Sequence, residues 1–318
     1  VLSSLAMKRK GSRRELLVGA GTWGVAAATS GVTGETAEAR CLPRPARKPA
    51  PPNPGVSPID RAFVRLAEGP VHYRYMDDSR RRAELPIVML HASPGSSERL
   101  APLIPGLANG RLVIAPDTLG NGDSPPPALR ETTIAYYVDA NLRLLDALGI
   151  EQADFYGTHT GAQIAAQLAV TQPRRVRKLI LDGVPLFTDE YKKEALANYA
   201  PEMTPQADGS HLMWAWNRSG SATTPPDEKQ ASVMLQLKAL TTYHIAYRAA
   251  FAQDVHALLP KIAQPTLVMA IKRDPLSAFV DQAAAMIPGA TKELVETSPG
   301  IIGKLPAIQR FFGIPDAG

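Results

Sequence analysis

The residues of this sequence best suited to proton transfer lie in short polar segments that follow apolar runs. Four such segments occur in chain order: HASPGS at 91–96, PDTLGNGDS at 116–124, FYGTHTGA at 155–162 and KRDPL at 272–276. The third places His159 between Gly157 and Gly161, and the fourth contains Asp274. An imidazole held by a carboxylate can take a proton from water or from a carbon acid near neutral pH. The histidines and carboxylates of these segments, His159 and Asp274 among them, are therefore the first candidates for catalysis.

In this order and spacing, the four segments resemble the α/β-hydrolase superfamily over roughly residues 60–313. In the G-x-S-x-G motif of that superfamily the nucleophile lies on a strained turn, and the glycines let a strand and a helix approach closely. Gly157 and Gly161 match these glycines. The resemblance implies an oxyanion hole formed by the backbone N–H groups of Ser93 and Thr160. Each such donor stabilises an oxyanionic transition state by roughly 3–4 kcal/mol.

The sequence departs from the superfamily at two of the three triad positions. His159 occupies the nucleophile position, Ile301 stands where the general-base histidine is expected, and no histidine follows His256. Asp274 matches the acid, and Asp182 is a second possible acid after an earlier strand. These departures exclude an acyl-serine mechanism with a Ser-His-Asp triad. Histidine tolerates positive φ better than most residues, so His159 can keep the turn and act as base or unusual nucleophile.

Three functions are compatible with this atypical triad. The first is a hydrolase without a cofactor that acts on a small apolar ester, lactone or similar electrophile. The second is a lyase, isomerase or decarboxylase that uses His159 to move a proton, because one fold supports many chemistries. The third is a ligand-binding pseudo-enzyme in which His159 is inert. His91, Asp117 and Ser124 are expected to hold loops rather than to react.

Apolar runs and helical periodicities alternate along the body of the chain. A hairpin is expected across residues 63–75. Further strands are predicted at 87–90, 112–115, 178–181, 266–270 and 291–296, and helices at 132–148, 161–171 and 277–287. This alternation predicts an α/β-hydrolase fold for residues 60–318: a mostly parallel sheet with helices on both faces.

The segment 186–258 interrupts this alternation and is predicted to form a helical cap over the sheet. Caps of this kind wall the pocket at the carboxyl ends of the strands. Aromatic residues with polar edges are expected to line the substrate pocket: Trp214, Trp216, Tyr243 and His244. His211 or His244 could also supply the missing base from the cap.

Residues 1–39 have the layout of a twin-arginine export signal. Basic residues that include Arg13 and Arg14 precede an uncharged stretch, and Ala37-Glu38-Ala39 forms a cleavage site. Residues 40–59 are rich in proline and predict a stiff linker. The expected location is the periplasm or the extracellular space, without stable membrane association after cleavage. An uncleaved membrane anchor is the alternative.

Composition sets further limits on partners and cofactors. The chain has 318 residues, of which 45% are hydrophobic and 20% charged, which is a globular composition. Its formal net charge of +5 falls to +3 when residues 1–39 are removed, and no basic stripe with interleaved aromatics remains. We therefore expect a small-molecule substrate and no nucleic acid, with the oligomeric state left open. Cys41 is the single cysteine and the six histidines form no H-x-x-x-H pair, so no metal is expected.

Overall fold

The computed structural model describes residues 58–79, 84–199, 201–220, 223–296 and 300–315. The predicted export signal and nearly all of the predicted linker lie outside these residues. The chain divides into two units, residues 1–51 and residues 52–318, and the described residues belong to the second. None of its described helices is long and apolar enough to cross a membrane.

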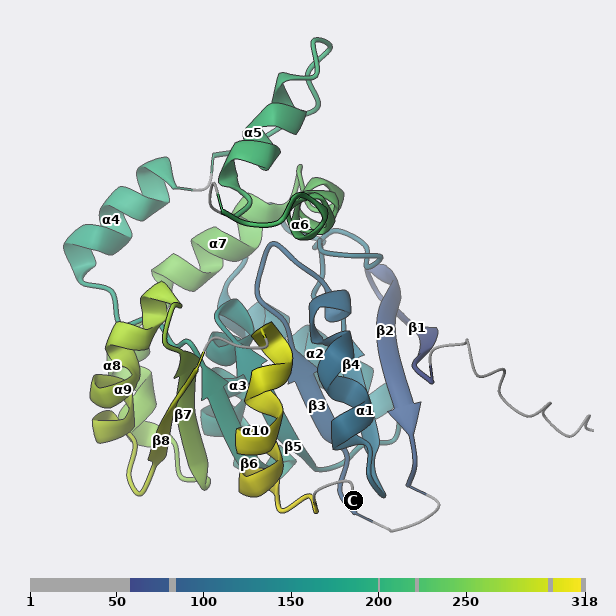
Figure 1. Ribbon diagram of the computed structural model, residues 1–318, viewed down its shortest axis with the longest axis vertical. Coiled ribbons are helices and arrows are strands. Elements are labelled where there is room, and N and C mark those ends of the chain that lie inside the picture. The colour runs from purple at the N-terminus through teal and green to yellow at the C-terminus, as the bar shows by residue number, and fades with distance from the viewer. Residues whose placement is uncertain (1–57, 80–83, 200, 221–222, 297–299, 316–318) are drawn as a thin grey trace, which may run out of the picture. The chain divides into compact units, whose positions relative to one another are not determined.

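A single sheet organises the described residues (Figure 1). Its strands are β1 (Asp60–Leu66), β2 (Gly69–Asp77), β3 (Ile87–Leu90), β4 (Leu112–Pro116), β5 (Ala153–Thr158), β6 (Val176–Asp182), β7 (Thr266–Ile271) and β8 (Thr291–Val295). They lie side by side in the order β1-β2-β4-β3-β5-β6-β7-β8. The β1–β2 hairpin and the β2–β4 pair are antiparallel, and the remaining neighbours are parallel. The carboxyl ends of the parallel strands therefore meet at one edge.

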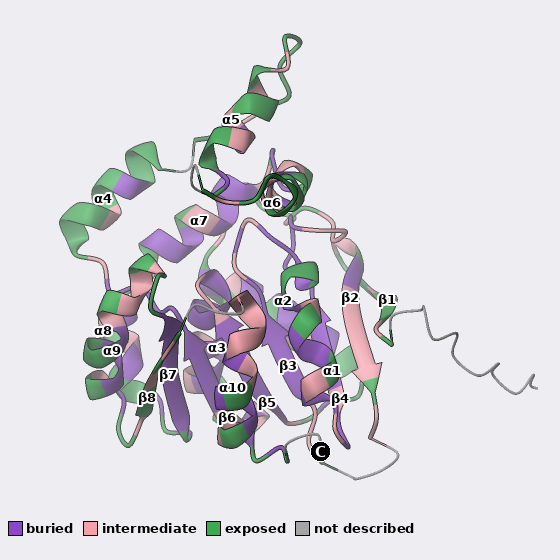
Figure 2. Cartoon of the chain, viewed as in Figure 1, coloured by how far each residue is buried: buried purple, intermediate pink, exposed green. Residues whose placement is uncertain are grey.

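Helices cover both faces of this sheet because the central strands are apolar on both sides. One face carries α2 (Ile134–Ala147), α3 (Thr160–Thr171), α8 (Val255–Leu258) and α9 (Val280–Met286), and the other carries α1 (Ile104–Leu107) and α10 (Leu305–Phe312). Alternate strand residues enter opposite cores: Val88 and Phe155 join the first, and Met89 and Tyr156 join the second. Figure 2 shows the central strands as almost entirely buried. This arrangement confirms the predicted fold class.

Four helices lie between β6 and α8 in the chain and form the cap. They are α4 (Asp189–Asn198), α5 (Ser210–Arg218), α6 (Pro226–Lys238) and α7 (Tyr243–Ala252). In Figure 1 they lie beyond the carboxyl ends of the parallel strands. One predicted helix differs in detail: residues 275–279 form a 3₁₀ helix before α9 begins, because Pro275 follows Asp274, which caps this turn.

Candidate active site

A sharp turn between β5 and α3 places His159 at the edge of the sheet. Its backbone has φ 50° and ψ −114°, and it is the one non-glycine residue with positive φ among those the structure describes. A Cβ at Gly157 would lie 2.3 Å from the Gly161 carbonyl oxygen, and one at Gly161 would lie 2.2 Å from that of Leu90. Only glycine therefore permits this close approach of strand and helix. The His159 N–H donates to the Asp182 carbonyl oxygen at 2.9 Å, which fixes the turn against β6.

The imidazole of His159 reaches the acid that follows β7. Its Nε2 lies 2.6 Å from Oδ2 of Asp274. The other oxygen, Oδ1, accepts from the Leu276 N–H at 2.9 Å. An ionised Asp274 can only accept, so in the tautomer that makes this hydrogen bond the proton lies on Nε2 and the lone pair on Nδ1. The side chain retains 38% exposure and lines a cavity.

The Asp274 carboxylate is suited to holding the ring in this way. Burial raises its pKa, but the hydrogen bond and charge of His159, the Leu276 N–H and the charge of Lys304 together outweigh this effect. The net pKa of Asp274 is therefore below its ordinary value. An ionised carboxylate at this point fixes the orientation of the imidazole and stabilises it when it becomes protonated.

The alternative acid, Asp182, does not contact the imidazole through its carboxylate. Its Oδ2 instead accepts hydrogen bonds from Tyr156 Oη and Lys304 Nζ inside the protein. Ile301 packs its side chain against the core between the sheet and α10. The second possible acid, Asp182, is thus part of a buried ion pair, and the position expected for the general-base histidine carries an apolar side chain.

The two expected oxyanion donors lie on the same cavity as His159. Ser93 and Thr160 both line it and are 4% and 5% exposed. Thr160 opens α3, where the first N–H groups of a helix have no acceptor within the helix. Ser93 Oγ is buried without a partner among the described residues. The placement of both residues suits an oxyanion hole, and that role remains a prediction.

A cavity of about 580 Å³ opens above His159 between the sheet edge and the cap. Its walls are largely aromatic, with rings contributed by α4 and the residue that ends it, by α7, by the loop that follows β6 and by the 3₁₀ helix that follows β7. These residues are Phe187, Tyr191, Tyr199, Tyr247, Phe251 and Phe279. Phe187 packs against Tyr191 and Phe251 at ring distances of 4.4 and 5.8 Å. Among the described lining residues, Asp274 is charged and neither lysine nor arginine occurs.

The pocket residues expected from the cap sequence are placed elsewhere. Tyr243 and Trp214 pack together in a separate small core, Trp216 lies under the Lys229 ammonium at 5.0 Å, and His244 is buried on α7. None of these residues is part of the described cavity lining, and neither is His211. The helical spacing of Tyr243, Tyr247 and Phe251 identifies the correct face of α7. Tyr247 and Phe251 line the cavity but Tyr243, one turn earlier, does not, because only the end of α7 nearer α3 reaches the site.

His91 holds the loop that follows β3, as expected from the sequence. Its Nε2 accepts from the Thr118 N–H at 2.9 Å, and its Nδ1 donates to the Ala92 carbonyl oxygen at 2.7 Å. Complete burial is the main reason that the pKa of His91 is lowered. The ring is therefore a neutral structural link between two loops.

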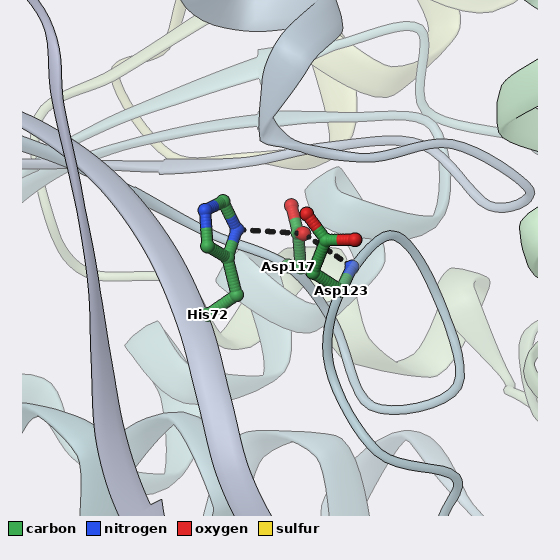
Figure 3. A group of neighbouring side chains, drawn as sticks. All are labelled: His72, Asp117 and Asp123. Atoms are coloured by element: carbon green, nitrogen blue, oxygen red, sulfur yellow. Dashed lines mark hydrogen bonds and ion pairs between the residues drawn. The ribbon is translucent and has the colours of Figure 1, made fainter.

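A second cluster near the sheet edge contains His72, Asp117 and Asp123 (Figure 3). His72 Nδ1 donates to Asp117 Oδ2 at 2.8 Å, and the Asp123 N–H donates to the same oxygen at 2.9 Å. Arg61 Nε donates to His72 Nε2, and both Arg61 and Lys238 pair with the Asp123 carboxylate. Since protein donors and cations already occupy these atoms, the cluster orders the loop rather than fitting a metal ion.

Comparison with known proteins agrees with this architecture. The family model described as "alpha/beta hydrolase fold" matches residues 86–298. The chain belongs to this family. The α/β-hydrolase fold is also shared by solved structures. A hydrolase from Pseudomonas aeruginosa has 21% sequence identity and a TM-score of 0.64, and the match covers 82% of this chain and 97% of that protein. The enol-lactonase from Burkholderia xenovorans has 22% sequence identity and a TM-score of 0.61, and the match covers 79% of this chain and 96% of that protein.

Curated relatives of this α/β-hydrolase chain are more similar over shorter stretches. A 2-hydroxymuconate semialdehyde hydrolase from Pseudomonas sp. (strain CF600) is 45% identical over 106 residues, which are 32% of this chain and 37% of the relative. A putative carbamate hydrolase from Pseudomonas savastanoi is 26% identical over 67% of this chain and 86% of its own length. The chain thus spans little more than a third of the length of the first of these relatives.

Proposed function

We propose that this α/β-hydrolase chain hydrolyses a small apolar ester, lactone or similar electrophile, with His159 as the base that activates water. The observation that carries the proposal is the 2.6 Å hydrogen bond between His159 Nε2 and Asp274. It leaves the Nδ1 lone pair as the proton acceptor beside the cavity.

The proposed reaction has two proton transfers through one nitrogen. Nδ1 of His159 takes a proton from water as the water oxygen bonds to the substrate carbonyl carbon. The carbonyl oxygen becomes an oxyanion that accepts hydrogen bonds from the N–H groups of Ser93 and Thr160. Collapse of this intermediate breaks the carbon–oxygen bond to the alcohol, which takes the proton back from Nδ1. Asp274 stabilises the imidazolium between the two transfers.

The cavity and the relatives both support this class of substrate. Burying an unpaired charge costs several kcal/mol, so a lining without lysine or arginine among the described residues favours an uncharged substrate. The aromatic walls favour an apolar one. Relatives named 2-hydroxymuconate semialdehyde hydrolase, 3-oxoadipate enol-lactonase and putative carbamate hydrolase act on small molecules.

Kinetics on a panel of aryl acetates and small lactones tests the proposal. His159→Ala is expected to lower kcat/KM by about 10²–10⁴-fold, the usual contribution of a general base. His211→Ala is the matched control, because His211 lies outside the described cavity lining and is expected to change nothing. Equal activity of His159→Ala and the native chain refutes the proposed role.

Two chemical probes separate the base from other roles. A fluorophosphonate that reacts with activated serines is expected to leave the protein unlabelled, and labelling of Ser93 would move the reaction to that hydroxyl. Mass spectrometry after acid quenching is expected to show no acyl adduct, whereas an adduct on His159 makes it a nucleophile.

Exchange of a substrate proton with solvent without hydrolysis would indicate the lyase or isomerase alternative. Tight binding without any turnover would indicate the pseudo-enzyme.

We also propose that the chain is exported by the twin-arginine route. The support is the sequence alone: the arginine pair, the weakly apolar stretch and the cleavage site within residues 1–39. Replacing Arg13 and Arg14 by lysine in the full chain is expected to keep the protein in the cytoplasmic fraction. Unchanged fractionation of this variant contradicts the proposed route.

A further inference from the structure

A buried carboxamide lies on the cavity wall one helical turn after His159. Gln163 on α3 is 3% exposed and is one of the residues that line the cavity. Its N–H donates to the His159 carbonyl oxygen at 3.1 Å. Thr160 and Gln163 are three residues apart and share a face of α3. Helical side chains lean toward the N-terminus of their helix, so the carboxamide lies toward the end of α3 that carries Thr160.

One hydrogen bond fixes which way this amide faces. Gln163 Nε2 donates to the Ala250 carbonyl oxygen on α7 at 2.9 Å. A carbonyl oxygen can only accept, so the amide nitrogen must face α7 and Oε1 is directed away from that bond. The cap therefore holds the carboxamide in one orientation.

The oxygen of this amide is left free. Oε1 accepts no hydrogen bond from the residues that the structure describes, and none of their fully enclosed polar atoms without a partner belongs to Gln163. It therefore keeps contact with open space, and the open space beside Gln163 is the cavity. An acceptor in apolar surroundings is costly unless a ligand supplies a donor.

The carboxylate on the same wall is already used. One oxygen of Asp274 accepts from His159 and the other from the Leu276 N–H. Among the side chains of the described lining residues, Gln163 therefore carries the one amide or carboxylate oxygen without a donor. Such an oxygen accepts from an N–H or an O–H and forms no hydrogen bond with an ether or a hydrocarbon.

We propose that Gln163 Oε1 is a binding subsite that accepts a hydrogen bond from an N–H or O–H group beside the reacting carbonyl of the substrate. This inference rests on the proposed function, because it takes the carbonyl to lie at Thr160. It narrows the substrate to an uncharged ester or lactone that carries an amido or hydroxyl group next to the carbonyl, with its apolar part against the aromatic wall. Gln163 contacts the substrate but takes no proton in the reaction.

Matched substrate pairs test the subsite. N-acetylglycine phenyl ester has an N–H where phenyl 4-oxopentanoate has a CH₂ group, and phenyl 2-hydroxypropanoate has a hydroxyl where phenyl 2-methylpropanoate has a methyl group. The ratio of kcat/KM within each pair is compared between the native chain and Gln163→Met, because the intrinsic reactivity of the esters cancels in this comparison. Gln163→Met is expected to lower the ratio about tenfold in the pair whose donor meets Oε1. The pair that responds distinguishes an amide N–H from a hydroxyl.

Gln167 provides the matched control. It lies one turn further along α3, and its Oε1 accepts from Gln253 Nε2 at 2.7 Å, outside the described cavity lining. Gln167→Met therefore removes a similar contact between α3 and the end of α7, and it should leave both ratios unchanged. If Gln163 only holds the cap, its loss lowers kcat/KM equally for both members of a pair. Such a uniform loss, or an unchanged ratio in both pairs, overturns the proposed subsite.

Binding of benzyl ketones separates the subsite from catalysis. In these analogues of the two pairs a CH₂ group replaces the ester oxygen, so that no ester bond can be hydrolysed. Calorimetric titration of the native chain is expected to give a Kd about tenfold lower for the donor-bearing ketone of the responding pair, and a ratio near one for Gln163→Met. Gln163→Leu is the second variant if Gln163→Met fails to fold.

The two proposals can fail separately. A Kd ratio near one for both ketone pairs in the native chain overturns the subsite without any variant. If the ketones are discriminated but no ester is hydrolysed, the proposed function fails and the subsite stands. If the esters are hydrolysed with ratios that do not depend on Gln163, the subsite fails and the proposed function stands.

Discussion

Glycine at position 159 should give a more stable protein than alanine, which reverses the usual order of these two residues. The backbone of His159, at φ 50° and ψ −114°, lies where side chains with a Cβ are strained. His159→Gly and His159→Ala both lose the imidazole and its hydrogen bond to Asp274. The difference between the two variants therefore reports the backbone strain, reduced by the greater freedom of glycine in the unfolded chain.

The size of this difference follows from two opposing effects. A non-glycine residue in such a conformation costs about 1–3 kcal/mol. The greater freedom of glycine in the unfolded chain costs about 0.4–1 kcal/mol. We expect His159→Gly to unfold with a free energy about 1 kcal/mol higher than His159→Ala, which corresponds to about 2–4 °C in Tm for a domain of this size.

Urea unfolding and calorimetry of the two variants provide the assay. Asp139, an exposed residue inside α2, is a matched control site. There the glycine variant should be the less stable by about 1 kcal/mol, because the helical backbone favours alanine. An alanine variant at 159 that equals or exceeds the glycine variant would refute the strained turn.

Three further variants address the surroundings of this turn. The pKa of Asp274 is lowered in the folded state, so its carboxylate stabilises the fold above its unfolded-state pKa and loses this effect as the pH falls. The free energy of unfolding of Asp274→Asn, measured by urea titration, should therefore depend less on pH below about pH 4 than that of the native chain. Gly183→Ala should displace the His159 ring, since the new Cβ would lie 2.7 Å from Cδ2, and should lower kcat/KM at least about tenfold while shifting the His159 NMR signal. Asp117→Asn should destabilise the protein by about 2–4 kcal/mol, because both carboxylate oxygens accept hydrogen bonds from buried donors that include His72; a loss below about 0.5 kcal/mol would contradict this reading of the cluster.

Local patterns were sufficient to predict the sheet and the turn. The buried strands read as short apolar runs because both faces of a central parallel strand are covered. Gly157 and Gly161 could be interpreted from their spacing because the close approach of β5 and α3 excludes any side chain. The partnership of His159 with a carboxylate was also expected, since an imidazole at that turn extends beyond a serine hydroxyl.

The cap was less predictable from its sequence. Aromatic residues recur along α5 and α7, and the sequence does not say which of them face the cavity. Trp214 and Tyr243 form a small core of their own, while Tyr247 and Phe251 line the site. The difference depends on where α7 crosses α3, which is a property of helix packing rather than of local periodicity.

The sequence by itself determined the order of the elements, the glycine-flanked turn and the presence of a histidine where a nucleophile is usual, because each is encoded by residues close together in the chain. Only the tertiary structure decided which acid meets His159. Asp182 and Asp274 both end strands at the same edge, and one is bound by Lys304 from a segment more than a hundred residues away. Contacts across such distances depend on how the strands are ordered in the sheet, and no local pattern specifies that order.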